Sequence, residues 1–248
     1  FFSDTTVNFE PSVEDIVENG KRPVLAGMSK IAGEEAIRLG MERLSRQHPK
    51  LFIIGFGNVG RVAANIGVNK YNRRPIIIDL EQNKTQLLNE FKSLLTSEDR
   101  LKTTFLFAKN PESVSSLLAV QIKALVGTRD ALGIPYGPVL VVLAPYAPEN
   151  HAPIIITNEM LKDIPAGSVI VDVSIDQGGA CEFSRVTTHE NPIIELEHGI
   201  KYIGIPNLPG GVPKRSTPVF SESVFPYMMQ IVKLGVIGAL KANPALRG

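Results

Sequence analysis

Short apolar runs alternate with amphipathic segments along most of the chain. The runs are rich in Ile, Val, Leu and Phe, as strands buried on both faces of a parallel sheet are. The segments between them repeat apolar residues three and four positions apart, which predicts helices. The predicted strands are 51–54, 75–79, 103–107, 139–144, 168–174 and 202–205. This alternation predicts an α/β fold with a doubly wound parallel sheet.

The first and last predicted helices are the longest. Ser29 is a candidate N-cap for a helix over about 30–47, which His48-Pro49 would end. The last helix is predicted from about Ser221 to Ala242, after a proline-rich stretch at 207–218 with the composition of a linker. The other predicted helices are 60–69, 83–96, Pro111 to about Val126, and a short one near 157–162.

The first predicted strand leads directly into a glycine turn with the pattern GxGxxG, Gly55 to Gly60. The first glycine permits a tight turn, the second lets a pyrophosphate approach the backbone, and the third lets the next helix pack close to the strand. The start of that helix offers unpaired N–H groups to phosphates. We therefore predict that a dinucleotide binds at Gly55, Gly57, Asn58, Val59 and Gly60.

Asp79 ends the second predicted strand, about 20 residues after the turn, where dinucleotide-binding folds place an acidic residue. A carboxylate there accepts hydrogen bonds from both hydroxyls of an adenosine ribose. It repels a 2′-phosphate, so the sequence predicts NAD rather than NADP. The alternative is an ordinary glycine-rich turn with Asp79 as a solvated strand end.

A second candidate site follows the fifth predicted strand, at Asp176-Gln177-Gly178-Gly179. Ligands of open parallel sheets bind beyond the carboxyl ends of the strands, so Asp176 is expected near a nicotinamide ring. The two glycines would let the backbone approach that flat ring. The spacing gives equal weight to an alternative, a turn in which Asp176 only hydrogen-bonds the backbone.

Composition excludes several other functions. The net charge of +1 and the absence of a Lys/Arg block argue against nucleic-acid binding. The single cysteine, Cys181, excludes an internal disulfide framework and fits a reducing, cytoplasmic compartment; we expect it to be a small buried residue. The four histidines show no metal-binding spacing, so no metal site is predicted. No uninterrupted apolar run approaches the ~20 residues that span a bilayer.

Four segments resemble the alanine dehydrogenase family, which also contains the transhydrogenase α-subunit. They are PVLAGMSKIAG (23–33), SVIVDVSIDQGGACEFSRVTTHENP (168–192), IPNLPGGVPKRST (205–217) and NPALRG (243–248). The resemblance implies NAD-dependent conversion of L-alanine and water to pyruvate and ammonia, and the reverse reaction. It also implies a Rossmann NAD-binding domain at 27–215, with 1–26 and 216–248 as remnants of a second, split substrate domain.

The same resemblance implies roles for individual residues. Ser29 would contact the cofactor phosphates, while Asp79 and Lys84 would face the adenosine ribose. Asp176 would handle protons at the substrate, and Asn207 would lie in the nicotinamide–substrate pocket. The resemblance further implies a homo-oligomer when the protein is full length, with the apolar C-terminal helix at a subunit contact.

The chain also departs from the family pattern. The family's substrate-binding Arg and Lys and its catalytic His lie upstream of PVLAGMSKIAG, and the residues before Pro23 contain no His. The N-terminal lobe is therefore expected to be missing, with the chain a fragment or a partial form. The loop at 144–153 and the segment 108–110 also differ from the family form. Two alternatives stay open: a transhydrogenase-like NAD-binding subunit, and a non-catalytic NAD-binding module.

Overall fold

The computed structural model describes residues 23–44, 49–94, 103–125, 137–145, 151–243 and 246. Their packing divides them into two units. The first unit comprises 23–31 together with 212–243 and 246, and the second comprises the described part of 32–211. Helix α2 (Pro23–Arg43) begins in the first unit and continues into the second. The middle of the loop at 144–153 lies outside the described residues.

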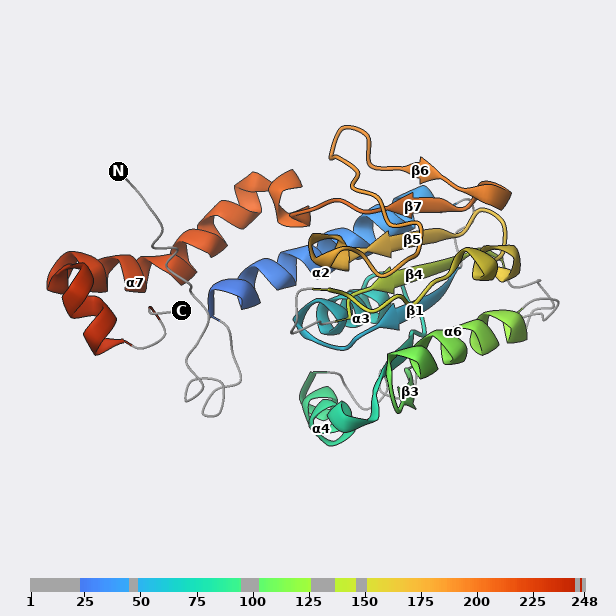
Figure 1. Cartoon of the computed structure of the whole chain (residues 1–248), viewed down its shortest axis with the longest axis horizontal. Helices are drawn as coiled ribbons and strands as arrows, with labels where there is room; N and C mark the ends of the chain where they lie inside the picture. Colours follow the sequence, from blue (N-terminus) through green and yellow to red (C-terminus); the bar gives the residue numbers. More distant parts are fainter. Residues whose placement is uncertain are drawn as a thin grey trace. The chain divides into compact units, whose positions relative to one another are not determined.

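The second unit is built on a seven-stranded sheet in the order β3-β2-β1-β4-β5-β7-β6 (Figure 1). All neighbouring strands are parallel except β6, which pairs antiparallel with β7. The strands are β1 (Lys50–Ile54), β2 (Ile76–Leu80), β3 (Thr104–Ala108), β4 (Val139–Leu143), β5 (Val169–Asp172), β6 (Ile194–Glu195) and β7 (Lys201–Ile203). The strand order reverses between β1 and β4, and ligands of open parallel sheets generally bind beyond the carboxyl ends of the strands at such a point.

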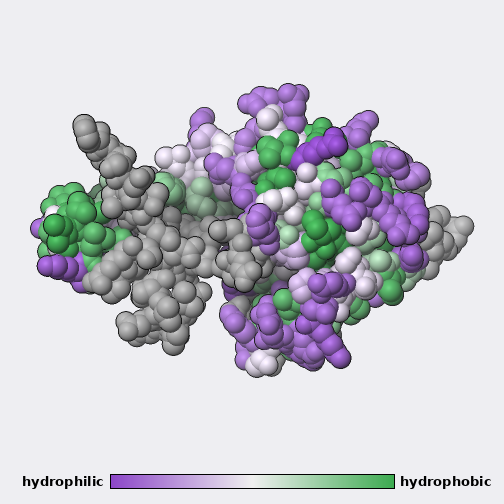
Figure 2. Space-filling view, in the orientation of Figure 1, coloured by the Kyte–Doolittle hydropathy of each residue, from purple (hydrophilic) through white to green (hydrophobic). Residues whose placement is uncertain are grey.

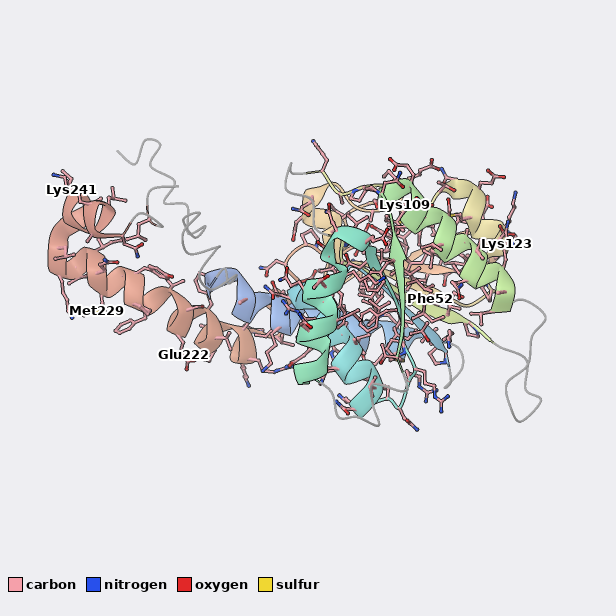
Figure 3. All side chains as sticks on the ribbon, turned by 90° about the horizontal axis from the view of Figure 1, so that it is seen from below. Phe52, Lys109, Lys123, Glu222, Met229 and Lys241 are labelled. Carbon is pink, nitrogen blue, oxygen red and sulfur yellow. The ribbon has the colours of Figure 1, made fainter. Side chains whose placement is uncertain are left out.

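Both faces of the sheet are covered. Along β1, Phe52 and Ile54 point into one core and Leu51 and Ile53 into the other, so the four residues after Lys50 are all apolar. Helix α6 (Pro111–Leu125) and η2 (Asn158–Asp163) contribute to the first core. Helices α2, α3 (Asn58–Asn69) and α4 (Lys84–Leu94) contribute to the second. Figure 3 shows Phe52 inside this packing. The predicted doubly wound α/β fold is confirmed.

Most predicted element bounds agree with the structure to within two residues. This holds for the six predicted strands and for α3, α4 and α6. The segment near 157–162 forms a 3₁₀-helix rather than an α-helix. The prediction also omitted β6, whose two residues are too few to produce an alternating pattern.

The bounds of α2 were predicted wrongly. The helix begins at Pro23, so Ser29 lies inside it and does not cap it. Proline is tolerated in the first helical turn because its missing N–H would have no partner there. Gly27 and Gly33 weaken the helical signal, yet each lies so close to a neighbouring residue, Val219 or Val59, that a side chain would collide with it.

The predicted linker was also wrong. Leu208–Gly211 forms a 3₁₀-helix, η5, and the long helix α7 (Pro213–Ala242) begins well before Ser221. Pro218 and Pro226 lie within α7, and Gly235, with φ of 68°, interrupts it. Two prolines between 207 and 218 therefore start or continue a helix instead of excluding one.

Helix α7 presents large apolar side chains to solvent. Figure 2 shows hydrophobic residues on the surface of its C-terminal part. The exposed residues are Phe220, Phe225, Met228, Val232, Leu234, Val236 and Ile237. By length and composition α7 meets the criterion for a membrane-crossing helix, with a mean hydropathy of 1.4 over 18 residues. One such helix is weak evidence for a membrane span, because core helices of soluble proteins and signal sequences have the same length and composition.

Candidate functional site

The glycine turn connects the end of β1 to the start of α3, and two of its glycines are required by the fold. Gly55 has φ of 85°, and a Cβ there would collide with the carbonyl oxygen of Ala144. A Cβ on Gly60 would collide with the carbonyl oxygen of Gly55, so α3 could not pack this close to the turn. These contacts agree with the predicted roles of the first and third glycines.

Gly57 differs from both. Its φ of −70° and ψ of −162° suit any residue, and among the described residues, its chain neighbours aside, a Cβ there would meet no atom within 4 Å. Gly57 is the N-cap of α3, and no side chain caps the helix. The space above Gly57 therefore opens onto uncapped N–H groups at a helix N-terminus, an arrangement that binds phosphate groups.

Asp79 lies beside this turn and is tied to it. One carboxylate oxygen, Oδ2, accepts a hydrogen bond from the Phe56 N–H at 2.6 Å. The other, Oδ1, accepts from the Leu80 N–H at 2.6 Å and from Asn83 Nδ2 at 2.8 Å. The side chain is buried, so the alternative of a solvated strand end is wrong. Each oxygen has two lone pairs, so the carboxylate has capacity left for a ribose hydroxyl.

Lys84 and Asn58 lie at the starts of the two helices that follow these strands. Lys84 opens α4, and its ammonium lies 5.5 Å from the ring centroid of Phe107. Phe107 is the register partner of Asp79 on β3, so the Lys84 ammonium lies over the residue that pairs with Asp79 in the sheet. The Asn58 side-chain oxygen accepts a hydrogen bond from Arg61 at 2.8 Å, within the first turn of α3. Val59 follows Asn58 in that turn.

Asp176 lies in a short 3₁₀-helix, η3 (Val173–Gln177), at the carboxyl end of β5. Its side chain is exposed and has no hydrogen-bond or ion-pair partner among the described residues. The alternative in which Asp176 hydrogen-bonds the backbone therefore receives no support there. Gly179, with φ of 84°, packs against Ser184, so its lack of a side chain is already required by the fold.

Asn207 follows β7 and has φ of 52°, unusual for a residue with a side chain. Its carbonyl oxygen accepts hydrogen bonds from the Gly210 N–H at 2.8 Å and from His189 Nε2 at 3.3 Å. A carbonyl oxygen only accepts, so the Nε2 atom carries the hydrogen. His189 thus supports the turn that contains Asn207.

The parallel strands bring most of the predicted site residues to one edge of the second unit. The glycine turn, Asp176 and Asn207 follow β1, β5 and β7, and Asp79 lies at the carboxyl end of β2. The carboxyl ends of parallel strands share an edge. Ser29 is buried in α2 and belongs to the first unit. No group of His, Cys, Asp or Glu residues suitable for a metal ion occurs among the described residues.

Sequence analysis missed Asp172, the last residue of β5. It is buried, and its carboxylate accepts four hydrogen bonds, from Ser174, Ala180, Ser184 and Tyr202. Burial raises the pKa of the Asp172 carboxyl above its usual value, although all four hydrogen bonds oppose the shift. The available signal was an acidic residue inside the apolar run SVIVDVS.

These residues fit a dinucleotide. The open space at Gly57 admits a pyrophosphate, the α3 N-terminus supplies N–H donors, and Asp79 supplies an acceptor for ribose. Beyond the glycine turn, the exposed Asp176 provides an ionisable group at the same edge. The arrangement can therefore bind a dinucleotide and present a carboxylate to its other end.

Known proteins resemble this chain over nearly its whole length. The alanine dehydrogenase of Bacillus subtilis is 32% identical over 250 residues, covering 94% of this chain and 59% of that protein. Alanine dehydrogenase 1 of Staphylococcus aureus (strain N315) is 31% identical, covering 95% of this chain and 61% of that protein. The chain thus spans about 60% of the length of these relatives.

Solved structures agree. An L-alanine dehydrogenase superposes with a TM-score of 0.73 at 27% identity, over 97% of this chain and 61% of that chain. A transhydrogenase from Sinorhizobium meliloti superposes with a TM-score of 0.67 at 17% identity, over 92% of this chain and 61% of that chain, a likeness of fold alone. Residues 37–248 match the family described as "Alanine dehydrogenase/PNT, C-terminal domain", an NAD(H)-binding domain. The chain therefore belongs to the alanine dehydrogenase/PNT family and contains its C-terminal domain.

Proposed function

We propose that this chain is the NAD-binding part of an alanine dehydrogenase, an oxidoreductase that interconverts L-alanine and pyruvate with release or uptake of ammonia. The observation that supports the cofactor most directly is the unfilled space above Gly57. The fold does not need a glycine there, whereas a bound pyrophosphate does. The alanine dehydrogenase relatives support the substrate.

Different residues of the chain would bind different parts of the cofactor. The backbone N–H groups of Asn58, Val59 and Gly60 would bind the pyrophosphate. Asp79 accepts a hydrogen bond from the adenosine ribose, with Lys84 beside it. These contacts orient the cofactor, which supplies the hydride acceptor when bound.

Asp176 and Asn207 would act at the other end. Asn207 orients the nicotinamide and substrate. The exposed Asp176 carboxylate accepts and returns protons as water adds to the imine and ammonia departs. General acid–base help of this kind contributes about 10²–10⁴-fold in rate. No metal ion takes part in this scheme.

We further propose that 27–215 form the NAD-binding domain, and that 1–26 with 216–248 belong to a second, split substrate domain. The whole protein is a cytoplasmic homo-oligomer. The exposed apolar residues of α7 support this assembly, because solvent exposure of so many large side chains is unfavourable.

Binding and turnover test the proposal separately. Fluorescence titration of the 248-residue chain should show NADH binding at least ~10-fold tighter than NADPH binding, since a 2′-phosphate meets the Asp79 carboxylate. Tighter NADPH binding would refute the cofactor assignment. The chain alone should show little alanine oxidation at 340 nm, because the family's substrate-binding cations lie upstream of the matching segments.

The whole protein should oxidise L-alanine, and Asp176→Asn should abolish turnover while leaving NADH affinity unchanged. Glu182→Gln is a matched control, because Glu182 is an exposed acidic residue that accepts a hydrogen bond from the Asn158 N–H and has no proposed role in the site. If the whole protein binds NADH but transfers hydride only between nucleotides, the transhydrogenase-like alternative replaces the proposal. If it transfers none, the non-catalytic alternative does.

A further inference from the structure

Asp172 is a buried carboxylate at the carboxyl end of β5. It is 1% exposed, and among the described residues no Lys, Arg or His contributes to its environment. Burying a charge without compensation is costly. The four hydrogen bonds that it accepts provide the compensation. A buried polar network of this kind holds its members in one arrangement, so the question is which part of the chain it holds.

The donors come from both ends of the turn that contains Asp176. The Ser174 N–H donates to Oδ1 at 3.1 Å, and the Ala180 N–H donates to Oδ2 at 2.9 Å. Asp176 lies between Ser174 and Ala180 in the sequence, so the Asp172 carboxylate holds the backbone on both sides of Asp176. Two hydroxyl groups complete the set on Oδ2: Ser184 Oγ at 2.7 Å and Tyr202 Oη at 3.1 Å.

An amide could not replace this carboxylate. The two main-chain donors point to different oxygens, so an asparagine would direct its own NH₂ group at one of them. The hydroxyls of Ser184 and Tyr202 can rotate to become acceptors, but a main-chain N–H cannot. The geometry therefore requires two acceptor oxygens, which only the carboxylate provides.

The same hydrogen-bond network extends to the glycine turn. Ser174 Oγ donates to the carbonyl oxygen of Pro145 at 3.0 Å. The preceding residue, Ala144, donates its N–H to Ile54 and packs its carbonyl against Gly55. The Asp172 carboxylate is thus connected through Ser174 and Pro145 to the backbone that begins the glycine turn.

We propose that Asp172 is a positioning residue for the candidate active site. Its carboxylate fixes the 173–180 turn, so that the Asp176 side chain is presented at the carboxyl edge of the sheet at a set distance from the glycine turn. Asp172 itself does not contact substrate or cofactor. This inference rests on the proposed role of Asp176, and its tests separate the two.

Amide hydrogen exchange on the 248-residue chain tests the positioning directly. In Asp172→Asn, exchange at Ser174 and Ala180 should accelerate at least ~10-fold, while amides of β1 and β4 keep their rates. Tyr202→Phe is the matched control, because it removes one hydroxyl donor and leaves both main-chain donors bound; exchange there should change less than ~3-fold. Unchanged exchange at Ser174 and Ala180 in Asp172→Asn, or acceleration throughout the sheet, would overturn the proposal.

If Asp172→Asn does not fold, Ser184→Ala retains the test. The Ser184 hydroxyl donates to Asp172 and accepts from the Cys181 N–H at 3.0 Å. Its loss should accelerate exchange at Ala180 and Cys181 without altering β1 and β4. Wild-type exchange at both amides would count against the proposal.

Turnover by the whole protein distinguishes positioning from general destabilisation. Asp172→Asn should lower kcat about 10²-fold, as a misplacement near 1 Å does, with the KM for NADH and the number of NADH sites unchanged. If Asp176→Asn keeps wild-type turnover, the proposed function fails. If Asp176→Asn is inactive but Asp172→Asn keeps wild-type kcat, only the positioning inference fails.

Discussion

At the scale of single residues, the three glycines of the GxGxxG turn are present for different physical reasons. Gly55 and Gly60 are required by neighbouring backbone atoms, whereas Gly57 faces open space. A residue that the protein's own packing does not need, within a motif that otherwise fits tightly, points to a ligand. This distinction separates a cofactor site from an ordinary glycine-rich turn.

Paired alanine substitutions test the distinction. Gly57→Ala should weaken NADH binding about 10-fold or more, because its methyl group enters the pyrophosphate space, and should leave Tm nearly unchanged. Gly60→Ala should lower the free energy of unfolding by about 1–3 kcal/mol, as overpacking does. Fluorescence titration and thermal melts measure the two effects. Equal affinity in wild type and Gly57→Ala would show that no ligand occupies this space.

Asp79→Ala tests the basis of cofactor preference. Removing the carboxylate should weaken NADH binding and narrow the difference between NADH and NADPH, since the repulsion of a 2′-phosphate is lost. Asn83→Ala removes only a hydrogen bond to the same carboxylate and should leave the preference unchanged. If Asp79→Ala still prefers NADH over NADPH by the wild-type ratio, a group other than Asp79 discriminates between the two riboses.

Cys181 should be unreactive in the folded protein. Burial, and then the nearby negative charge of Asp172, raise the pKa of the thiol well above its usual value, so the reactive thiolate is scarce. At pH 8 the native chain should react with a disulfide reagent such as DTNB many-fold more slowly than the chain unfolded in urea. Equal rates would contradict the burial of Cys181.

The sequence located the residues whose roles depend on local pattern and missed the one whose role depends on distant partners. The glycine spacing identified the turn, and a strand end identified Asp79. Asp172 receives a hydrogen bond from Tyr202, thirty positions away, and no local pattern indicates that contact. The space above Gly57 likewise depends on what the rest of the fold leaves empty.

At the scale of elements, the strands were predictable and the ends of the long helices were not. Strands buried on both faces are apolar throughout, and this signal survives without knowledge of tertiary contacts. The start of α2 depends on Gly27 and Gly33 fitting against other elements. The start of α7 depends on prolines at positions where a helix tolerates them.

The exposed face of α7 predicts self-association of the whole protein. Phe225, Met228 and Val232 recur at helical spacing and form one stripe. Val232→Glu should shift the protein toward smaller species in sedimentation, because a charge would be buried at the contact. Val120→Glu, at an exposed position on α6, should leave the assembly unchanged. A monodisperse monomer of the wild-type whole protein would exclude the contact.

At the scale of the whole molecule, Asp172 should affect how stability depends on pH. Its folded-state pKa is raised, so the folded state retains a proton more readily than the unfolded state. The contribution of Asp172 to stability is therefore full below its unfolded pKa of about 3.9 and is lost as pH rises through the folded pKa. The titratable neighbours Cys181 and Tyr202 have raised pKa values and stay neutral there.

Urea unfolding at several pH values measures this effect. Relative to Asp172→Asn, the wild-type free energy of unfolding should fall as pH rises from about 4 through the folded pKa, and then level off. A wild type that instead gains stability relative to the variant over this range would show that the hydrogen bonds outweigh desolvation.

The reversal of strand order has a consequence for synthesis on the ribosome. The central strand β1 pairs with β4, and the paired positions Lys50 and Val139 are separated by about 90 residues. At a synthesis rate of roughly 5–20 residues per second, one edge of this largely apolar strand would remain unpaired for about 5–18 s. During those seconds the nascent chain exposes the unpaired N–H and C=O groups of an aggregation-prone strand edge. Binding by chaperones during translation should therefore matter more for this protein than the stability of its folded state suggests.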